Sequence, residues 1–102
     1  MDYAADIARY TDSDVDEDKV TAIVKYCGIA LRNKDSSLVS ASDPAELKTV
    51  VNGFAAKKLG LDSDDATAAL DKVMETMKGN RAKSRVTVYY LLAEQTGNLG
   101  KL

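Results

Sequence analysis

Apolar residues recur along this chain with the period of an α-helix. The clearest case lies within residues 16–33, where apolar side chains follow one another at spacings of three or four: Val20, Ile23, Val24, Cys27 and Leu31. No stretch alternates apolar and polar residues long enough to indicate a strand, which would require a period of two. We therefore predict an all-α fold.

The apolar pattern predicts about five helices, over residues 2–10, 16–33, 43–59, 62–78 and 82–96. The third has the most secure start, because Asp43 is placed as N-cap, Pro44 at the first helical position, and Glu46 where a capping box requires it. The fifth is apolar on more than one side, so we expect it to be the central helix.

The length of 102 residues predicts a single compact domain, residues 1–102. A chain of this size buries roughly 60 to 70% of its unfolded surface, which is enough for a core without disulfides or metals. The first helix is short and therefore marginal unless it docks. Whether residues 1–14 form a loosely docked acidic segment is left open by the sequence.

Two glycines, Gly28 and Gly53, interrupt the helical patterns. Each is expected to cost about 1 kcal/mol of stability relative to alanine, so a structural reason is needed. We expect neighbouring helices to approach closely at both positions, with a flexible hinge as the alternative.

Charge is unevenly distributed along the chain. Residues 1–18 contain seven acids and one cation, a net charge of −6, although the whole chain carries only −2. By contrast, Arg81, Lys83 and Arg85 place three cations around the start of the fifth helix, while its acid, Glu94, lies near the end. A helix start carries partial positive charge and favours anions, so we predict that Arg81, Lys83 and Arg85 bind an anion or a partner.

Three sources for that anion remain open. The acidic N-terminal segment could neutralise the cations, within one chain or across a dimer. A nucleic acid or other polyanion could bind them with help from Lys57 and Lys58, although the overall charge and a pI near 5.0 do not support this partner. A small phosphorylated or carboxylated ligand could bind the guanidinium groups and the free amides of the helix start.

The chain lacks the residues of the common catalytic and metal sites. It has no histidine and one cysteine, which excludes His-containing triads and structural zinc. Cys27 lies on an apolar stripe, so we expect a core residue. Asp12, Asp14 and Asp16 resemble the start of a calcium loop, but Glu17 stands where that loop requires glycine. We predict no cofactor and no metal, and favour a binding protein over an enzyme.

A polar segment, residues 34–37 with Ser40 and Ser42, is the other candidate for chemistry. Its serines are more typical of helix caps and turns than of nucleophiles. The chain starts without a signal-peptide pattern, and no window approaches the roughly 18 apolar residues of a membrane span. We therefore expect a cytoplasmic protein that does not enter membranes.

Four ordered segments carry a resemblance to a known family. They are KDSSLV at 34–39, SDPAEL at 42–47, KKLGL at 57–61 and KSRVTVYYLLA at 83–93. Together they resemble a family of small bacterial proteins, domain of unknown function 2853, over about Val15 to the C-terminus, with the acidic stretch before Val15 outside the match. The resemblance implies a bacterial origin and a compact helical fold. It implies no activity, cofactor or catalytic residue, and partners stay open between another protein and a second copy of the chain.

Overall fold

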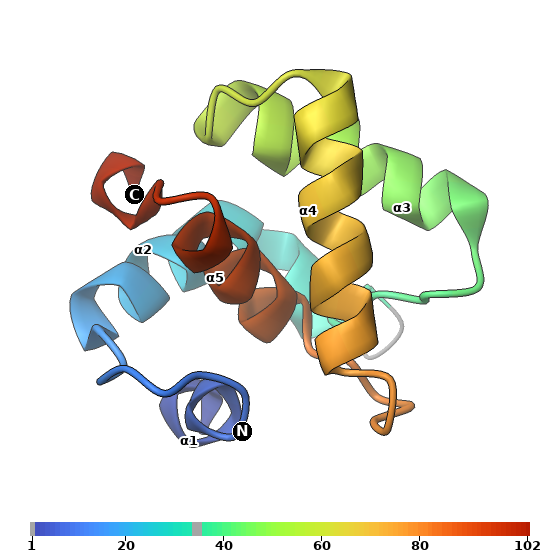
Figure 1. Ribbon diagram of the computed structural model, residues 1–102. Coiled ribbons are helices and arrows are strands. Elements are labelled where there is room, and N and C mark those ends of the chain that lie inside the picture. Colours follow the sequence, from blue (N-terminus) through green and yellow to red (C-terminus); the bar gives the residue numbers. More distant parts are fainter. Residues whose placement is uncertain (1, 34–35) are drawn as a thin grey trace.

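In the part of the chain that the structure describes, five α-helices build the fold, and α5, the fifth, runs through its centre (Figure 1). The structure is a computed structural model that describes residues 2–33 and 36–102. The helices are α1 (Tyr3–Ala8), α2 (Glu17–Cys27), α3 (Pro44–Val50), α4 (Ser63–Thr76) and α5 (Arg85–Gln95). Within the described ranges there is no extended strand, and the predicted all-α fold is confirmed.

The helix α5 forms the core because it is buried on every side. All of its residues from 85 to 93 are buried, and α1, α2 and α4 pack around it. Its polar side chains are satisfied within the protein: the Thr87 hydroxyl donates to the buried carboxylate of Asp6, and the Tyr90 hydroxyl accepts from the N–H of Asp16 at 2.9 Å. The predicted central position of the fifth helix is therefore confirmed.

Aspartates cap the starts of α2, α3 and α4 near the predicted boundaries. Asp43 accepts from the N–H of Ala45 at 3.0 Å, and Asp16 and Asp62 act in the same way for their own helices. The second half of the expected capping box is absent at α3. The Asp43 N–H donates to the Ser40 carbonyl at 3.3 Å, and the Glu46 side chain reaches Arg85 instead.

The second helix is shorter than predicted. It ends at Cys27 because Gly28 has a φ of 50°, a left-handed conformation that glycine adopts without strain. A 3₁₀-helix, η1 (Gly28–Arg32), continues the chain. A side chain at Gly28 would meet nothing within 4 Å, so the expected close approach of another helix is wrong, and the backbone turn explains the glycine.

The third helix changes its geometry halfway. After α3 the chain continues as a π-helix, η2 (Val51–Lys58), which the apolar period alone did not predict. Nothing lies within 4 Å of the position where Gly53 would carry a side chain, so close packing does not explain this glycine either. The π-helix places Phe54 against α5, where its ring stacks on that of Tyr89 with centroids 4.1 Å apart.

The fifth helix starts later than predicted, at Arg85 rather than Ala82. Ser84 stays outside the helix because it pairs with Leu38 in an isolated antiparallel bridge, and the Val39 N–H donates to the Lys83 carbonyl at 2.8 Å. As a result, Arg81 and Lys83 lie in the loop before the helix.

The N-terminal segment, α1 and the residues just after it, docks against α5 and the loop before α5. Ile7 is fully buried, and the Tyr10 hydroxyl accepts from the Asn80 side chain at 3.0 Å. The Thr11 hydroxyl donates to Glu94 at 2.9 Å, near the other end of α5. None of the helices in the described ranges is both long enough and apolar enough to cross a bilayer.

Candidate anion-binding site

The three cations predicted to act together have three different environments. Arg81 is exposed in the loop between α4 and α5. Lys83 is only 7% exposed, and its ammonium group donates to the Asn80 carbonyl at 2.6 Å. Arg85 is the first residue of α5 and is equally buried. Arg81 and Lys83 therefore lie beside one cavity. The Arg85 side chain is instead buried inside the protein.

Arg85 holds the segment before α3 against α5. Its guanidinium group donates to the carbonyls of Ser36 and Leu38, at 2.7 and 3.3 Å, and to the Tyr89 hydroxyl at 3.0 Å. It also forms an ion pair with Glu46 of α3, whose side chain is 24% exposed. Since five N–H groups are available on a guanidinium, this arrangement uses most of them.

The protonation state of Arg85 follows from those contacts. Burial lowers the pKa of Arg85, but hydrogen bonds and charge interactions with Tyr89 and Glu46 outweigh it and hold the pKa above its usual value. Burial has the opposite effect on the Tyr89 hydroxyl: it raises the pKa of Tyr89, and Arg85 opposes that change. Arg85 is thus a permanent cation whose counter-charge is supplied inside the protein.

The candidate site is a cavity of about 570 Å³ between two segments that are distant in sequence. Leu38 to Ser42 form one wall, and Arg81 and Lys83 form the other. We call this cavity the basic pocket. Its polar groups are two cations and the hydroxyls of Ser40 and Ser42, whose oxygens lie 3.3 Å apart.

The geometry of the basic pocket is fixed by backbone contacts. The bridge between Leu38 and Ser84 and the bond from Val39 to Lys83 join its two walls. Arg85 reinforces the join, because its own N–H donates to the Ser37 carbonyl at 2.8 Å. A preformed wall of this kind lowers the entropy that a ligand loses on binding.

Of the three predicted cations, Arg81 is the one whose side chain has no partner among the described residues. Among the described residues it takes part in no ion pair and no hydrogen bond, whereas Lys83 retains donors beyond the one given to Asn80. The described residues that line the pocket include no carboxylate. A pair of cations beside two hydroxyls forms an environment suited to a phosphate, sulfate or carboxylate group.

The acidic N-terminal segment does not supply that group in the described part of the chain. Asp12, Asp14 and Asp18 are exposed, and no ion pair there joins residues 12–18 to Arg81, Lys83 or Arg85. The acid that does reach Arg85 is Glu46. The buried acid of α1, Asp6, accepts from Thr87 and pairs with Arg9 at 3.5 Å.

The two candidate caps of the fifth helix also differ from each other. Ser84 occupies the N-cap position, but its hydroxyl makes no capping bond and is buried without a partner among the described residues. Asn80 instead orders its own loop, where its side-chain oxygen accepts from the Ala82 N–H at 2.9 Å. The loop that carries Arg81 is therefore held at both ends.

The residues of the polar segment, 34–37 with Ser40 and Ser42, do not share one environment. Ser40 and Ser42 belong to the basic pocket, Ser36 bonds to the Ala30 carbonyl at 2.6 Å, and Lys34 and Asp35 lie outside the described residues. The sequence indicated the serines and the cations as separate candidates, but it did not predict that they line the same pocket. It missed Glu46 as the partner of Arg85, which no local pattern indicates.

Cys27 and the acidic clusters offer little chemistry. Burial raises the pKa of the Cys27 thiol to about 11, with Arg85 opposing the change, so the thiol is protonated at neutral pH. Within the described ranges, no three cysteine or carboxylate side chains come together to hold a metal ion.

Comparison with known families gives the context for these residues. The family model described as "Protein of unknown function (DUF2853)" matches residues 2–100. The resemblance drawn from the sequence, which began at Val15, was too short, because the match includes the acidic N-terminal segment and α1. A comparison with curated proteins finds no match. Since nearly the whole chain is covered, the protein belongs to the family of unknown function DUF2853.

Proposed function

We propose that this protein is a non-enzymatic interaction module that binds an anionic group of a partner in the basic pocket. The observation that carries the proposal is Arg81, an exposed cation that has no side-chain partner in residues 2–33 and 36–102 and lies beside two serine hydroxyls and Lys83. The partner class that we favour is another protein presenting a phosphate or a carboxylate. The expected cytoplasmic location and bacterial source stay predictions.

Binding is favoured over catalysis because of the groups that line the basic pocket. General acid–base chemistry needs one group that releases a proton and one that accepts it near neutral pH. The titratable side chains among the lining residues are Arg81 and Lys83, which are both cations. Together with the serine hydroxyls they can hold an oxyanion, but they form no acid and base pair.

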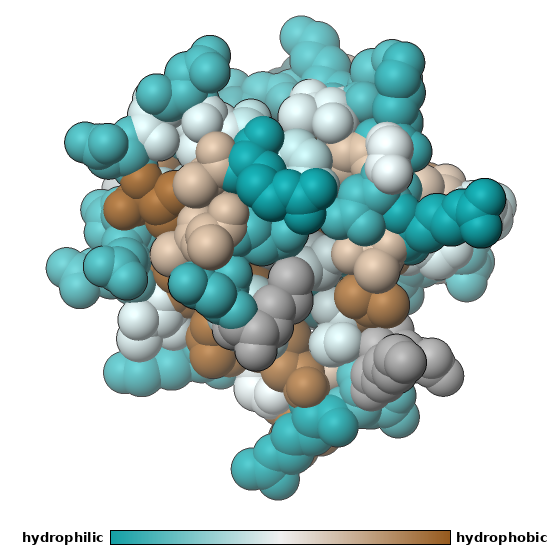
Figure 2. Space-filling model, turned by 90° about the horizontal axis from the view of Figure 1, so that it is seen from below, coloured by the Kyte–Doolittle hydropathy of each residue, from teal (hydrophilic) through white to brown (hydrophobic). Residues whose placement is uncertain are grey.

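The charge of the chain favours a protein partner over a nucleic acid. On the face seen from below in Figure 1, Figure 2 shows several separate apolar areas among hydrophilic side chains. A nucleic acid would meet a chain with a net charge of −2, and long-range repulsion opposes such an encounter. A single anionic group demands only the local charge of the pocket.

The direct test is thermal unfolding in which phosphate replaces chloride at constant ionic strength. We expect stabilisation of roughly 1.4 kcal/mol when the phosphate concentration is about ten times its Kd. The variants Arg81→Ala and Ser40→Ala should lose most of it. Arg32→Ala is the matched control, since Arg32 is also exposed but lies on η1, outside the pocket lining.

Two outcomes would contradict the proposal. Equal stabilisation of the parent and Arg81→Ala would place the anion elsewhere. Retention on a heparin column that falls steeply with salt, and is lost in Arg81→Ala, would instead assign the pocket to a polyanion. Arg85 is unsuitable for this test because its removal would disturb the fold.

A further inference from the structure

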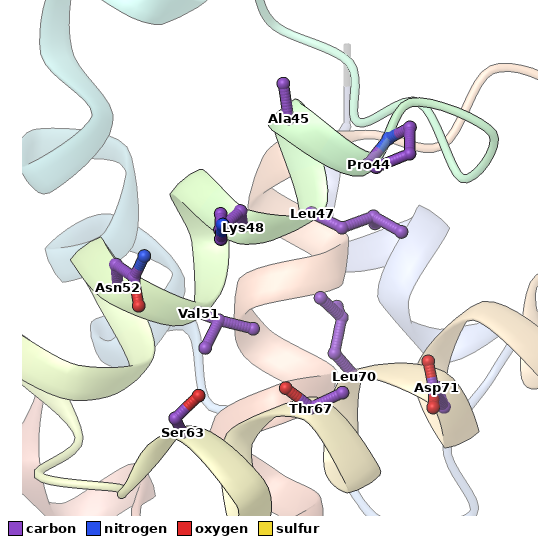
Figure 3. Close-up of a pocket in the computed structure, with 10 residues that line it drawn as sticks. All are labelled: Pro44, Ala45, Leu47, Lys48, Val51, Asn52, Ser63, Thr67, Leu70 and Asp71. Atoms are coloured by element: carbon purple, nitrogen blue, oxygen red, sulfur yellow. The ribbon is translucent and has the colours of Figure 1, made fainter.

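A second cavity, independent of the basic pocket, lies between α3, η2 and α4 and has a volume of about 520 Å³ (Figure 3). Its floor is apolar: Leu47 and Val51 on one side and Leu70 on the other point toward one another. Cavities of roughly 300 to 1,000 Å³ with an apolar floor are typical of small-molecule sites. We call this cavity the interhelical groove.

The walls of the groove carry side-chain hydrogen-bonding groups that have no partner among the described residues. Thr67 is the clearest example. Four other helical or helix-capping threonines donate to the carbonyl four residues earlier: Thr21, Thr49, Thr76 and Thr96. Thr67 makes no such bond in the described part of the chain, and its hydroxyl lies at the groove with that of Ser63 and the amide of Asn52 (Figure 3).

The lining of the groove contains one charged side chain of each sign. Lys48 of α3 lines one side and Asp71 of α4 the other, and neither takes part in an ion pair with another described residue. A fatty acid would satisfy Lys48 but leave its apolar tail beside Asp71. An uncharged apolar molecule would satisfy neither. The complementary ligand is apolar in the middle and carries one charge of each sign.

The π-helix adds a second reason to regard this groove as a site. Val51 and Asn52, from its floor and its wall, are the first two residues of η2. Segments of π-helix are less stable than α-helix and are frequent at functional sites. Here the change from α3 to η2 falls within the lining.

We propose that the interhelical groove binds a short apolar peptide with free termini. Its carboxylate lies toward Lys48 and its ammonium group toward Asp71. Its apolar side chains rest on Leu47, Val51 and Leu70, and its backbone amides face the amide and the two hydroxyls of the walls. A peptide backbone needs both donors and acceptors, which Asn, Ser and Thr side chains supply.

The test follows the methyl and amide NMR signals of the protein during titration with the dipeptide Leu-Leu. We expect saturable shifts at Leu47, Val51, Thr67 and Leu70. The N-acetylated, C-amidated form of the same dipeptide should bind roughly threefold to tenfold more weakly, because it lacks both charges. Octanoate, which has only the negative charge, should also bind more weakly.

Variants locate the binding. Thr67→Phe fills the groove and should abolish the shifts, whereas Ala68→Phe adds the same ring at an exposed neighbour that does not line the groove. Should Thr67→Phe fail to fold, Lys48→Met and Asp71→Asn, both at exposed positions, should each weaken Leu-Leu binding about threefold. Equal affinity for the blocked dipeptide, shifts that do not saturate, or loss of binding in Ala68→Phe would overturn the proposal. Arg81→Ala should leave the titration unchanged.

Discussion

Two arginines four positions apart, Arg81 and Arg85, have opposite roles in this protein. Arg85 is buried and bonded to two carbonyls, a hydroxyl and a carboxylate, so it joins α5 to the segment before α3 and to α3 itself. Arg81 is exposed and makes none of these contacts. The sequence presents them as one basic cluster. The hydrogen-bond and ion-pair partners inside the protein distinguish Arg85, a structural cation, from Arg81, a cation that is available to a ligand.

Replacing Arg85 should have the largest effect on stability. Arg85→Ala leaves Glu46 and two carbonyls without their partner, and breaking a buried pair in this way costs about 3–5 kcal/mol. Urea unfolding monitored by circular dichroism measures the loss. Arg81→Ala is the control and should lie within about 0.5 kcal/mol of the parent. Similar losses in both variants would remove the distinction between the two arginines.

Removing the acid of the pair should cost less. Glu46→Gln keeps one hydrogen-bond acceptor near Arg85 but removes the counter-charge, so we expect a loss of about 1–3 kcal/mol in the free energy of unfolding. If the two residues act as a pair, the double variant with Arg85→Ala will be less destabilised than the sum of the single losses by roughly 0.5–3 kcal/mol. Additive losses would show that Glu46 acts independently.

The influence of Arg85 should also be visible at Cys27. Because the pKa of the Cys27 thiol is about 11, alkylation by iodoacetamide should be slow at neutral pH and should accelerate as the pH approaches that value. A raised pKa in the folded protein means that the unfolded chain loses this proton first. The Cys27 contribution to stability is therefore present below the thiol's usual pKa and is lost as the pH rises toward 11.

The pH dependence of Cys27 alkylation, measured in the two arginine variants, should again distinguish Arg81 from Arg85. Arg81→Ala should leave the profile of Cys27 unchanged. Arg85→Ala, in conditions where it remains folded, should shift the profile to higher pH, because Arg85 opposes the rise in the pKa of Cys27. Rapid alkylation of the parent at neutral pH would contradict the buried environment of the thiol.

The smallest effect is expected at Ser84, between the two arginines. Its hydroxyl is buried without a partner among the described residues, so Ser84→Ala removes an unsatisfied group. We expect a change within about 0.5 kcal/mol, in either direction, by urea unfolding. Thr87→Ala is the contrast, because it removes the hydroxyl that donates to the buried Asp6 carboxylate, and this loss should cost about 1–3 kcal/mol.

Local patterns in the sequence correctly predicted the features that depend on local contacts, namely the helix starts and the burial of the fifth helix. Asp16, Asp43 and Asp62 cap their helices because each bonds to an N–H two or three residues away. The apolar sides of the fifth helix predicted its burial for the same reason, since helical period is itself local. These features needed no knowledge of the tertiary fold.

The errors arose where a distant segment decides the local structure. The late start of α5 depends on a bridge to Leu38, and the role of Glu46 depends on a residue 39 positions away. The basic pocket was half predicted: its cations and serines were both noted, but the contact that brings them together is not encoded in any spacing. Gly28 was wrongly attributed to close helix packing. Glycine is favoured both by a positive φ and by a close approach of two helices, so the sequence does not distinguish the two causes.

The position of α5 also bears on when this protein can fold during synthesis. Four helices precede α5 in the chain, and α1, α2 and α4 bury their apolar faces against it. The hydrogen bond from Thr87 to Asp6 spans 81 residues, which is a long loop for a helical protein to close. A nascent chain therefore exposes the apolar faces of its early helices until α5 has left the ribosome, so native packing of these helices has to wait for α5.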